Sequence, residues 1–293
     1  MGKINLAEGL PARVGVLGGG RMGAGIAHAF LMKGAEVVVV ERDEQAEEGA
    51  RERVESSVAK SIERGAVDGA LPEAKAAILE SFTTSLDYAA FADRDLVVEA
   101  VPEDPALKKA ALTGVEAVLG AGAFLATNTS SLSVSKLAES LARPERFLGL
   151  HFFNPVPAST LIEVVVAEKT APELAAAAKA WTEALGKTAV VVRDAPGFAS
   201  SRLGVAIALE AMRMVEEGVA SAEDIDNAMV LGYKHPTGPL KTTDIVGLDV
   251  RLGIAEYLHS TLGDRFAPPQ ILRDKVANGE LGRKTGKGFY TWN

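Results

Sequence analysis

The sequence predicts an α/β protein in which a doubly wound, mostly parallel sheet is followed by a smaller all-helical domain. Over the first two thirds of the chain, short apolar runs alternate with helical patterns, as βαβ units require. Strand patterns then stop at a turn-rich Asp-Ala-Pro-Gly segment, residues 194–197. We therefore expect two domains, 1–194 and 195–293.

The expected strands of the first domain are short and apolar. Residues 14–17 end in a glycine-rich turn, and a helical pattern follows as far as Gly34. Residues 37–40 are four valines, typical of a parallel strand that is covered on both faces. Further strands are expected at 96–101, 123–127, 147–150, 161–166 and 189–192, and further helices at 44–64 and 174–185.

The second domain shows helical periodicity. Apolar residues cover most of the circumference of its first helix: Leu203, Val205, Ile207, Leu209, Met212 and Val215. Such a helix is buried inside a domain or in a subunit interface. Ser221 is positioned to cap the next helix.

Composition excludes several classes of protein. The 293 residues include 31 Lys and Arg against 39 Asp and Glu, so the net charge of −8 disfavours general binding to nucleic acid or to a membrane surface. The absence of cysteine excludes disulfides, thiolate metal sites and a Cys nucleophile, and fits a reducing compartment. No apolar run has the length of a membrane span, and residues 1–13 do not resemble a signal peptide. We expect a cytoplasmic protein without a metal site.

The turn after the first strand has the spacing of a dinucleotide site, Gly18-x-Gly20-x-x-Gly23. Glycines there permit a tight turn and let a pyrophosphate approach the backbone at a helix N-terminus. Glu41 ends the second strand 18 residues after Gly23, where a carboxylate accepts the ribose hydroxyls and repels a 2′-phosphate. The pattern favours NAD over NADP, although Arg42 leaves that choice open.

Two carboxylates interrupt apolar strands, Glu99 and Glu163. Each either points outward from an edge strand or has a buried partner, because burying an unpaired carboxylate is costly. His151 follows an apolar strand 12 residues before Glu163, and a return of the chain would bring the two together. The pair would then form a proton relay to a substrate hydroxyl. The other histidines are expected to be structural: His28, His235 and His259.

Seven sequence motifs in this order resemble the L-3-hydroxyacyl-CoA dehydrogenases, most closely the single-function form that acts on 3-hydroxybutyryl-CoA. The resemblance runs from about Arg13 to Tyr290. The motifs are Gly18–Gly23, Asn128–Ser131, His151–Pro155, Pro196–Phe198, Gly238–Pro239, Asp244–Asp249 and Lys284–Tyr290.

The resemblance implies a role for each matching residue. His151 would be the catalytic base, Glu163 the carboxylate that orients it, Ser130 a contact to substrate and nicotinamide, and Asn154 a residue that positions both. The implied NAD contacts are Gly18, Gly19, Gly20, Arg21, Met22, Gly23, Glu41, Glu103, Lys108, Ser130, Asn154 and Lys284. Ser57 and Arg64 would bind coenzyme A. Ser201 stands where the family usually has an asparagine that assists substrate placement, which bears on substrate preference.

The implied activity is NAD-dependent oxidation of a short-chain (S)-3-hydroxyacyl-CoA in fatty acid metabolism. The substrate would enter between the two domains, and the C-terminal domain would form a homodimer. Three alternatives remain open. Asn128–Ser131 with His151 and an acid could belong to a serine hydrolase, although a Gly-x-Ser-x-Gly elbow is missing. The chain could bind NAD without catalysis, or oxidise a hydroxy acid that lacks coenzyme A.

Overall fold

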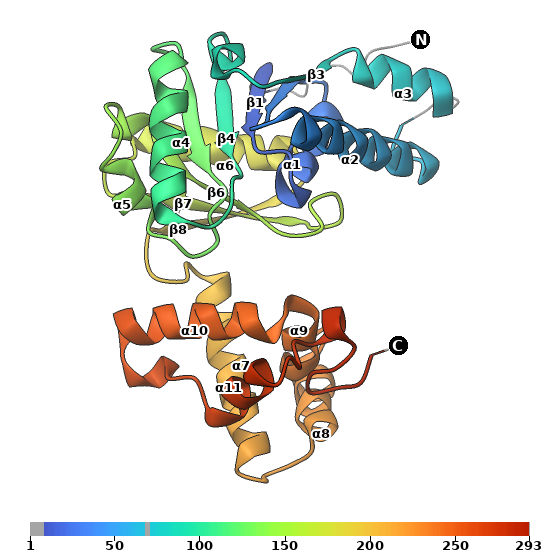
Figure 1. Ribbon diagram of the computed structural model, residues 1–293, viewed down its shortest axis with the longest axis vertical. Helices are drawn as coiled ribbons and strands as arrows, with labels where there is room; N and C mark the ends of the chain where they lie inside the picture. The colour runs from blue at the N-terminus through green and yellow to red at the C-terminus, as the bar shows by residue number, and fades with distance from the viewer. Residues whose placement is uncertain (1–8, 68–70, 293) are drawn as a thin grey trace. The chain divides into compact units, whose positions relative to one another are not determined.

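The computed structural model describes residues 9–67 and 71–292. The chain divides into two compact units, of which the first ends at Asp194 and the second begins at Ala195. The first unit is a sheet with flanking helices, and the second is helical (Figure 1). The expected fold class is confirmed. Among the described residues, no helix is both long and apolar enough to cross a membrane.

The first unit is built on a sheet whose eight described strands lie in the order β3-β2-β1-β4-β5-β6-β7-β8. Neighbouring strands of this sheet are parallel, except for the antiparallel pair β6–β7. The strands are β1 (Arg13–Leu17), β2 (Glu36–Val40), β3 (Phe82–Ser85), β4 (Leu96–Glu99), β5 (Phe124–Thr127), β6 (Phe147–Phe152), β7 (Leu161–Val166) and β8 (Thr188–Arg193).

Strand order reverses beside β1. The chain runs outward from β1 to β2 and β3, then returns to place β4 on the other side of β1. Open α/β sheets bind their ligands at such a reversal, outside the carboxyl ends of the strands. We therefore expect a ligand site at one edge of the sheet, where β1, β2, β4, β5 and β6 end.

Helices connect these strands: α1 (Arg21–Leu31), α2 (Glu44–Glu63), α3 (Leu71–Leu79), η1 (Tyr88–Phe91), α4 (Pro105–Val118), α5 (Val134–Ala138), η2 (Pro144–Arg146) and α6 (Pro172–Ala184). Local sequence sets where several begin. Asp43 accepts a hydrogen bond from the Ala46 N–H at 2.8 Å, and Asp104 accepts one from Leu107 at 2.7 Å. Such caps satisfy N–H groups that have no partner within the helix.

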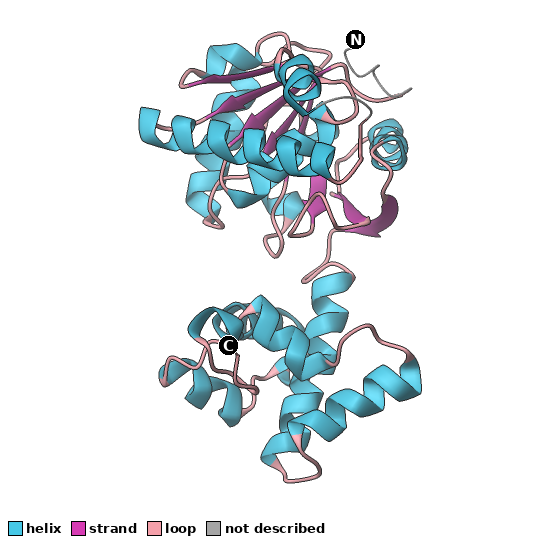
Figure 2. Cartoon of the chain, turned by 90° about the vertical axis from the view of Figure 1, so that its right-hand side faces the viewer, coloured by secondary structure: helices cyan, strands magenta, loops and turns pink. Residues whose placement is uncertain are grey.

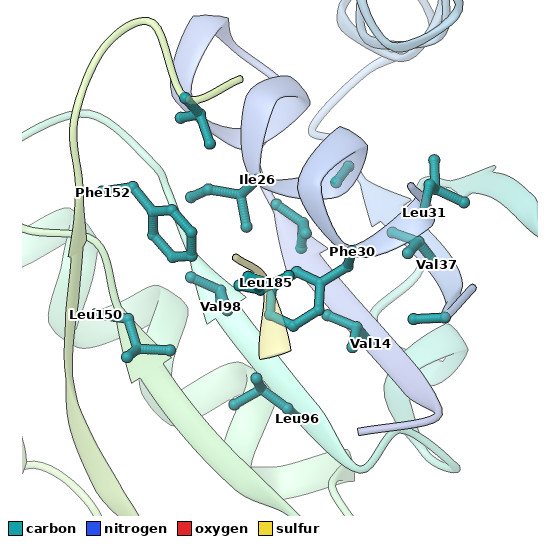
Figure 3. Packing of buried hydrophobic residues seen from close by; sticks show 14 of the residues in the cluster. Val14, Ile26, Phe30, Leu31, Val37, Leu96, Val98, Leu150, Phe152 and Leu185 are labelled. Carbon is teal, nitrogen blue, oxygen red and sulfur yellow. The ribbon is translucent and has the colours of Figure 1, made fainter. Parts of the chain in front are cut away.

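The core of this unit packs α1 on the sheet. Ile26 and Phe30 point from α1 toward Val14 of β1 and Val98 of β4, and all four are fully buried (Figure 3). Phe152 belongs to the same cluster. Because side chains alternate along a strand, His151 points to the opposite face of β6.

The second unit consists of α7 (Ser200–Glu216), α8 (Ala222–Asn227), η3 (Ala228–Gly232), α9 (Pro239–Val246), α10 (Leu248–Leu262), η4 (Asp264–Phe266), α11 (Gln270–Ala277) and η5 (Arg283–Thr285) (Figure 2). Only one apolar stripe of α7 enters its core, through Val205, Leu209 and Met212. Leu203 is 64% exposed and Ile207 39% exposed, and neither belongs to the core of this unit, so α7 is not buried on all sides within it.

Two buried aspartates hold the C-terminal segment of this unit. Asp244 accepts hydrogen bonds from the N–H groups of Phe289 and Tyr290, both at 2.9 Å, and from the Trp292 indole at 2.8 Å. Asp226 accepts from two N–H groups at the start of α9, at 2.8 and 2.9 Å, and from the Tyr290 hydroxyl at 2.8 Å. These donors satisfy both carboxylates, which explains how each can be buried.

Candidate active site

The glycine turn between β1 and α1 has a packed side and an open side. Gly18 has a φ of +90°, and a Cβ on Gly23 would lie 1.7 Å from the Gly18 carbonyl oxygen, so a larger residue at either position would distort the turn. A Cβ on Gly20, in contrast, would meet no described atom within 4 Å. The open side offers the backbone to a ligand.

The first turn of α1 suits an anionic group. Gly20 is its N-cap residue, no side chain caps this end in the described structure, and the first turn holds no acidic residue. N–H groups at a helix N-terminus favour phosphate through hydrogen bonding and through the helix dipole. Arg21 is exposed at this point, and Met22 is half-buried.

Glu41 follows β2 and lies against the turn. Its Oε1 atom accepts a hydrogen bond from the Gly19 N–H at 2.6 Å. Arg42, whose side chain is 82% exposed, donates from Nε to Asp43 at 2.8 Å. The carboxylate thus stands beside the glycine turn, and the residues of this region fit the pyrophosphate and ribose of NAD.

His151 and Glu163 meet across the antiparallel strands β6 and β7. They stand directly opposite in the register, and His151 Nδ1 lies 2.8 Å from Glu163 Oε2. Both residues are buried, with exposed fractions of 7% and 0%. The predicted contact is confirmed, and β7 lies between β6 and β8, so the edge-strand interpretation of Glu163 is wrong.

Ser130 lies in the loop after β5 and is half-buried. Glu103 Oε1 accepts from the Ser130 N–H at 3.0 Å, from the Thr129 hydroxyl at 2.6 Å and from the Ser131 N–H at 3.1 Å. Burial alone would raise the pKa of Glu103, but the positive charge of Lys108 and these donors outweigh it and lower that pKa. Glu103 therefore remains an anion that holds the loop.

Glu99 has a buried partner. Lys108 Nζ lies 2.7 Å from Glu99 Oε1, and the two residues are 1% and 0% exposed. Since β4 lies between β1 and β5, the outward-facing interpretation of Glu99 is wrong. Lys108 also donates to the Val101 carbonyl at 3.1 Å and lies 3.4 Å from Glu103 Oε2, so the ammonium has internal partners.

Asn128, for which the sequence suggested no separate role, joins two loops at this edge. Its side-chain oxygen accepts from the Phe152 N–H at 2.9 Å, which ties the end of β5 to the end of β6. Asn154 follows β6 by two residues and is exposed. The sequence signal that could have indicated a role for Asn128 is the run of amide and hydroxyl side chains, residues 128–131, directly after a buried strand.

The implied coenzyme A contacts lie on α2 and at its end. Ser57 and Arg64 are seven residues apart, about two helical turns, and so share one face. Ser57 is half-buried and Arg64 is exposed. Arg53, also on α2, instead donates to the Gly19 carbonyl at 3.1 Å.

Two expected site residues belong to the helical unit. Ser201 lies in the first turn of α7 and is half-buried. Lys284 Nζ lies 2.6 Å from both carboxylate oxygens of Asp249. The described part of the chain contains no group of three or more His, Asp or Glu residues that could hold a metal ion.

Comparisons with known proteins identify the family. Residues 13–195 match the model of the 3-hydroxyacyl-CoA dehydrogenase NAD binding domain, and residues 197–292 match that of the C-terminal domain of the same enzymes. The chain belongs to the 3-hydroxyacyl-CoA dehydrogenase family. It is therefore an NAD-dependent oxidoreductase, which argues against both the serine hydrolase and the non-catalytic NAD-binding protein.

Individual members of this family, and a solved diketoreductase, are similar to this protein over nearly its whole length. It is 40% identical over 281 residues to a probable 3-hydroxybutyryl-CoA dehydrogenase of Deinococcus radiodurans, covering 96% of this chain and 100% of that one. A solved (S)-3-hydroxybutyryl-CoA dehydrogenase from Ralstonia eutropha is 37% identical with a TM-score of 0.92, covering 97% and 99%. A solved diketoreductase, described as acting on dicarbonyl compounds, is 31% identical with a TM-score of 0.83, also covering 97% and 99%.

Proposed function

We propose that this enzyme oxidises short-chain (S)-3-hydroxyacyl-CoA esters such as 3-hydroxybutyryl-CoA to 3-ketoacyl-CoA, with His151 as the base. The observation that carries the proposal is the His151–Glu163 contact of 2.8 Å, at the same edge of the sheet as the glycine turn. The choice of a coenzyme A ester is supported by the names of the relatives from Deinococcus radiodurans and Ralstonia eutropha.

The two side chains divide the proton transfer between them. Glu163 holds Nδ1 of His151, so the ring exchanges its proton with the substrate through Nε2. His151 removes the proton of the 3-hydroxyl, and Glu163 stabilises the imidazolium that results. NAD, when bound at the glycine turn, would supply the acceptor for the hydride that leaves C3. In the reverse direction, the imidazolium donates its proton to the ketone oxygen.

Other residues would hold the reactants. The turn Gly18–Gly23 and Glu41 would bind the pyrophosphate and ribose of NAD, with Glu103, Lys108 and Lys284 as the further contacts that the resemblance implies. Ser130 and Asn154 would align the substrate with the nicotinamide, because misplacement of reacting groups is costly. Ser57 and Arg64 would contact coenzyme A, and Ser201 the acyl group.

The test is NADH formation with 3-hydroxyacyl-CoA esters of increasing chain length, repeated with NADP. We expect the highest kcat/KM with NAD and a short acyl chain. An enzyme that forms no NADH with any of these esters would contradict the proposal.

Ser201 favours one alternative substrate class, a hydroxy acid or other carbonyl compound without coenzyme A. Serine offers one donor where the usual asparagine amide offers two, and the diketoreductase described above shares this fold. Free 3-hydroxybutyrate, assayed beside its coenzyme A ester, separates the two. A higher kcat/KM for the free acid would replace the first proposal with this one.

We further propose that the enzyme is a cytoplasmic homodimer that pairs through its helical unit. Leu203 and Ile207 form an exposed apolar stripe on α7 that a second copy could cover. The absence of cysteine is compatible with a reducing compartment. Light scattering at micromolar concentration should give twice the chain mass, and Leu203→Glu should reduce it. A monomeric wild type would refute the dimer.

A further inference from the structure

Four polar side chains lie beneath the carboxyl edge of the sheet and are called here the Glu99 network: the buried Glu99, Lys108 and Thr127, and Glu103, whose side chain is 35% exposed. Glu99 and Thr127 are fully buried, and Lys108 is 1% exposed. An acid and a base buried this deeply are stable only when every donor and acceptor has a partner. The partners show what the network holds.

Glu99 is held from three sides. Its Oε1 atom accepts from Lys108 Nζ and from the Val101 N–H, both at 2.7 Å. Its Oε2 atom accepts from the Thr127 hydroxyl at 2.6 Å. The Val101 carbonyl in turn accepts from Lys108 at 3.1 Å, so both polar backbone groups of Val101 are fixed by the network.

Two routes lead from Glu99 to the loop that carries Ser130. One passes through Lys108, whose ammonium lies 3.4 Å from Glu103 Oε2, while Glu103 Oε1 accepts from the Ser130 N–H at 3.0 Å. The other passes through the Thr127 hydroxyl, which accepts from the Thr129 N–H at 3.3 Å. The loop is therefore anchored twice to one carboxylate.

We infer that Glu99 is a positioning residue for the reaction: it holds Lys108 and Thr127, and through them the loop that presents Ser130. The inference rests on the proposed function, in which Ser130 contacts the substrate. The side chain of Glu99 lies wholly in the interior and its oxygens are occupied by internal donors, so it acts through its neighbours.

Substituting Glu99 by glutamine keeps the shape of the side chain and removes its charge. The amide nitrogen cannot accept from Lys108 or Val101, so it would face the Thr127 hydroxyl and change that hydrogen bond. Lys108 would then have Glu103 as its ionic partner. The substitution therefore changes both routes to the loop at once. It leaves no cavity, because glutamine fills the same space as glutamate.

The experiment is a double-mutant cycle with Ser130→Ala, measured as single-turnover NADH formation from 3-hydroxybutyryl-CoA at saturating NAD. In the wild-type background, we expect Glu99→Gln to lower the rate about 10- to 100-fold. In the Ser130→Ala background, we expect it to lower the rate by less than about 3-fold, because the group being positioned is already gone. Equal losses in both backgrounds, or no loss in the wild type, would overturn the inference.

A matched control separates positioning from stability. Glu116 is another largely buried carboxylate of this unit, which accepts from the N–H groups of Ala142 and Arg143 at 2.8 Å each. Glu116→Gln should lower the Tm and leave the single-turnover rate unchanged. A loss of rate for Glu116→Gln equal to that for Glu99→Gln would mean that both effects are structural.

Thr127→Val provides a second variant should Glu99→Gln fail to fold. It interrupts the route through Thr127 alone, and the same non-additivity with Ser130→Ala is expected. An inactive wild type would overturn the proposed function and this inference with it. An active wild type with additive losses would overturn the inference alone.

Discussion

Both units of this enzyme bury carboxylates, but the carboxylates bind different kinds of partner. In the α/β unit, Glu163 holds an imidazole and Glu99 holds an ammonium group. In the helical unit, Asp226 and Asp244 accept from backbone N–H groups and from aromatic side chains of the same unit. A buried acid alone therefore does not indicate a functional site. A functional acid is distinguished from a structural one by the group that it binds and by where that group lies on the fold.

The physical reason lies in how each acid is compensated. The Asp244 carboxylate accepts hydrogen bonds from the C-terminal segment of its own unit, so these bonds contribute to the stability of the folded protein. Glu163 contacts an imidazole, a group that can gain or lose a proton, so the stability that this contact contributes also depends on the protonation state of His151. The comparison predicts that acids of the helical unit affect stability and that acids of the α/β site affect rate.

Removing the imidazole should give the largest effect. His151→Ala should lower kcat by about 10²- to 10⁴-fold, the usual contribution of a general acid–base group, and leave NADH affinity nearly unchanged. Steady-state kinetics and NADH titration check this. The control is His259→Ala, which removes a surface imidazole bound to Asp264 and should leave kcat unchanged. A fully active His151→Ala enzyme would rule out the role.

Asp244→Asn should instead lower the free energy of unfolding by about 2–4 kcal/mol, because an amide leaves at least one of its buried donors without an acceptor. Chemical denaturation measures it, and kcat per folded molecule should be nearly unchanged. Asp264→Asn is the control, since that side chain is fully exposed. If the stability of Asp244→Asn matched that of the wild type, the structural half of the comparison would fail.

Glu163→Gln should lower kcat by about 100-fold, the low end of an acid–base contribution, since the imidazole remains but is oriented by an amide. The rising limb of the pH–rate profile should move to lower pH, because an amide stabilises an imidazolium less than a carboxylate does. Glu168→Gln, an exposed acid just after β7, should change neither. An unchanged pH–rate profile for Glu163→Gln would argue against the pairing.

His28 sharpens the comparison, because it is a buried imidazole without a carboxylate. It lies on α1 with its Nε2 atom 2.9 Å from the Ser61 hydroxyl. Burial, aided by the positive charge of Lys187, lowers the pKa of His28 to about 4. The unfolded chain takes up this proton near pH 6.5, whereas the folded protein does so only near pH 4. Stability is therefore lost as the pH falls between those two values.

By pH 5 the loss attributable to His28 should be about 2 kcal/mol of unfolding free energy. Denaturation at pH 7.5 and pH 5 measures it. His28→Gln cannot titrate and should show a correspondingly smaller loss over that interval. An identical acid sensitivity in the two proteins would assign the effect to other groups.

The strands could be predicted where burial on both faces makes them continuously apolar, as in the valines of β2. β3 was missed because Thr83, Thr84 and Ser85 carry no such pattern, and it is identified by its pairing with β2. The boundary near residue 194 was visible because strand patterns stop there.

The His151–Glu163 contact was predictable for a similar reason, since a polar side chain inside an apolar strand requires a partner and one lay nearby in sequence. The Glu99 network was not, because Lys108 and Thr127 lie on a separate helix and a separate strand. Thr127 gave no signal at all, since a threonine is ordinary in a strand. The proposed roles of Ser57 and Arg64 rest on the family resemblance.

The antiparallel pairing of β6 with β7 has a consequence for how this family can change. The two side chains of the proposed proton relay are aligned by backbone hydrogen bonds between adjacent strands, so the exposed tip of the connection, residues 157–158, can lengthen or shorten while the alignment persists. A single residue inserted within β7 ahead of Glu163, however, would turn its carboxylate to the other side of the sheet. The tip of the connection is thus open to evolutionary variation in length, whereas the strands beside it tolerate none.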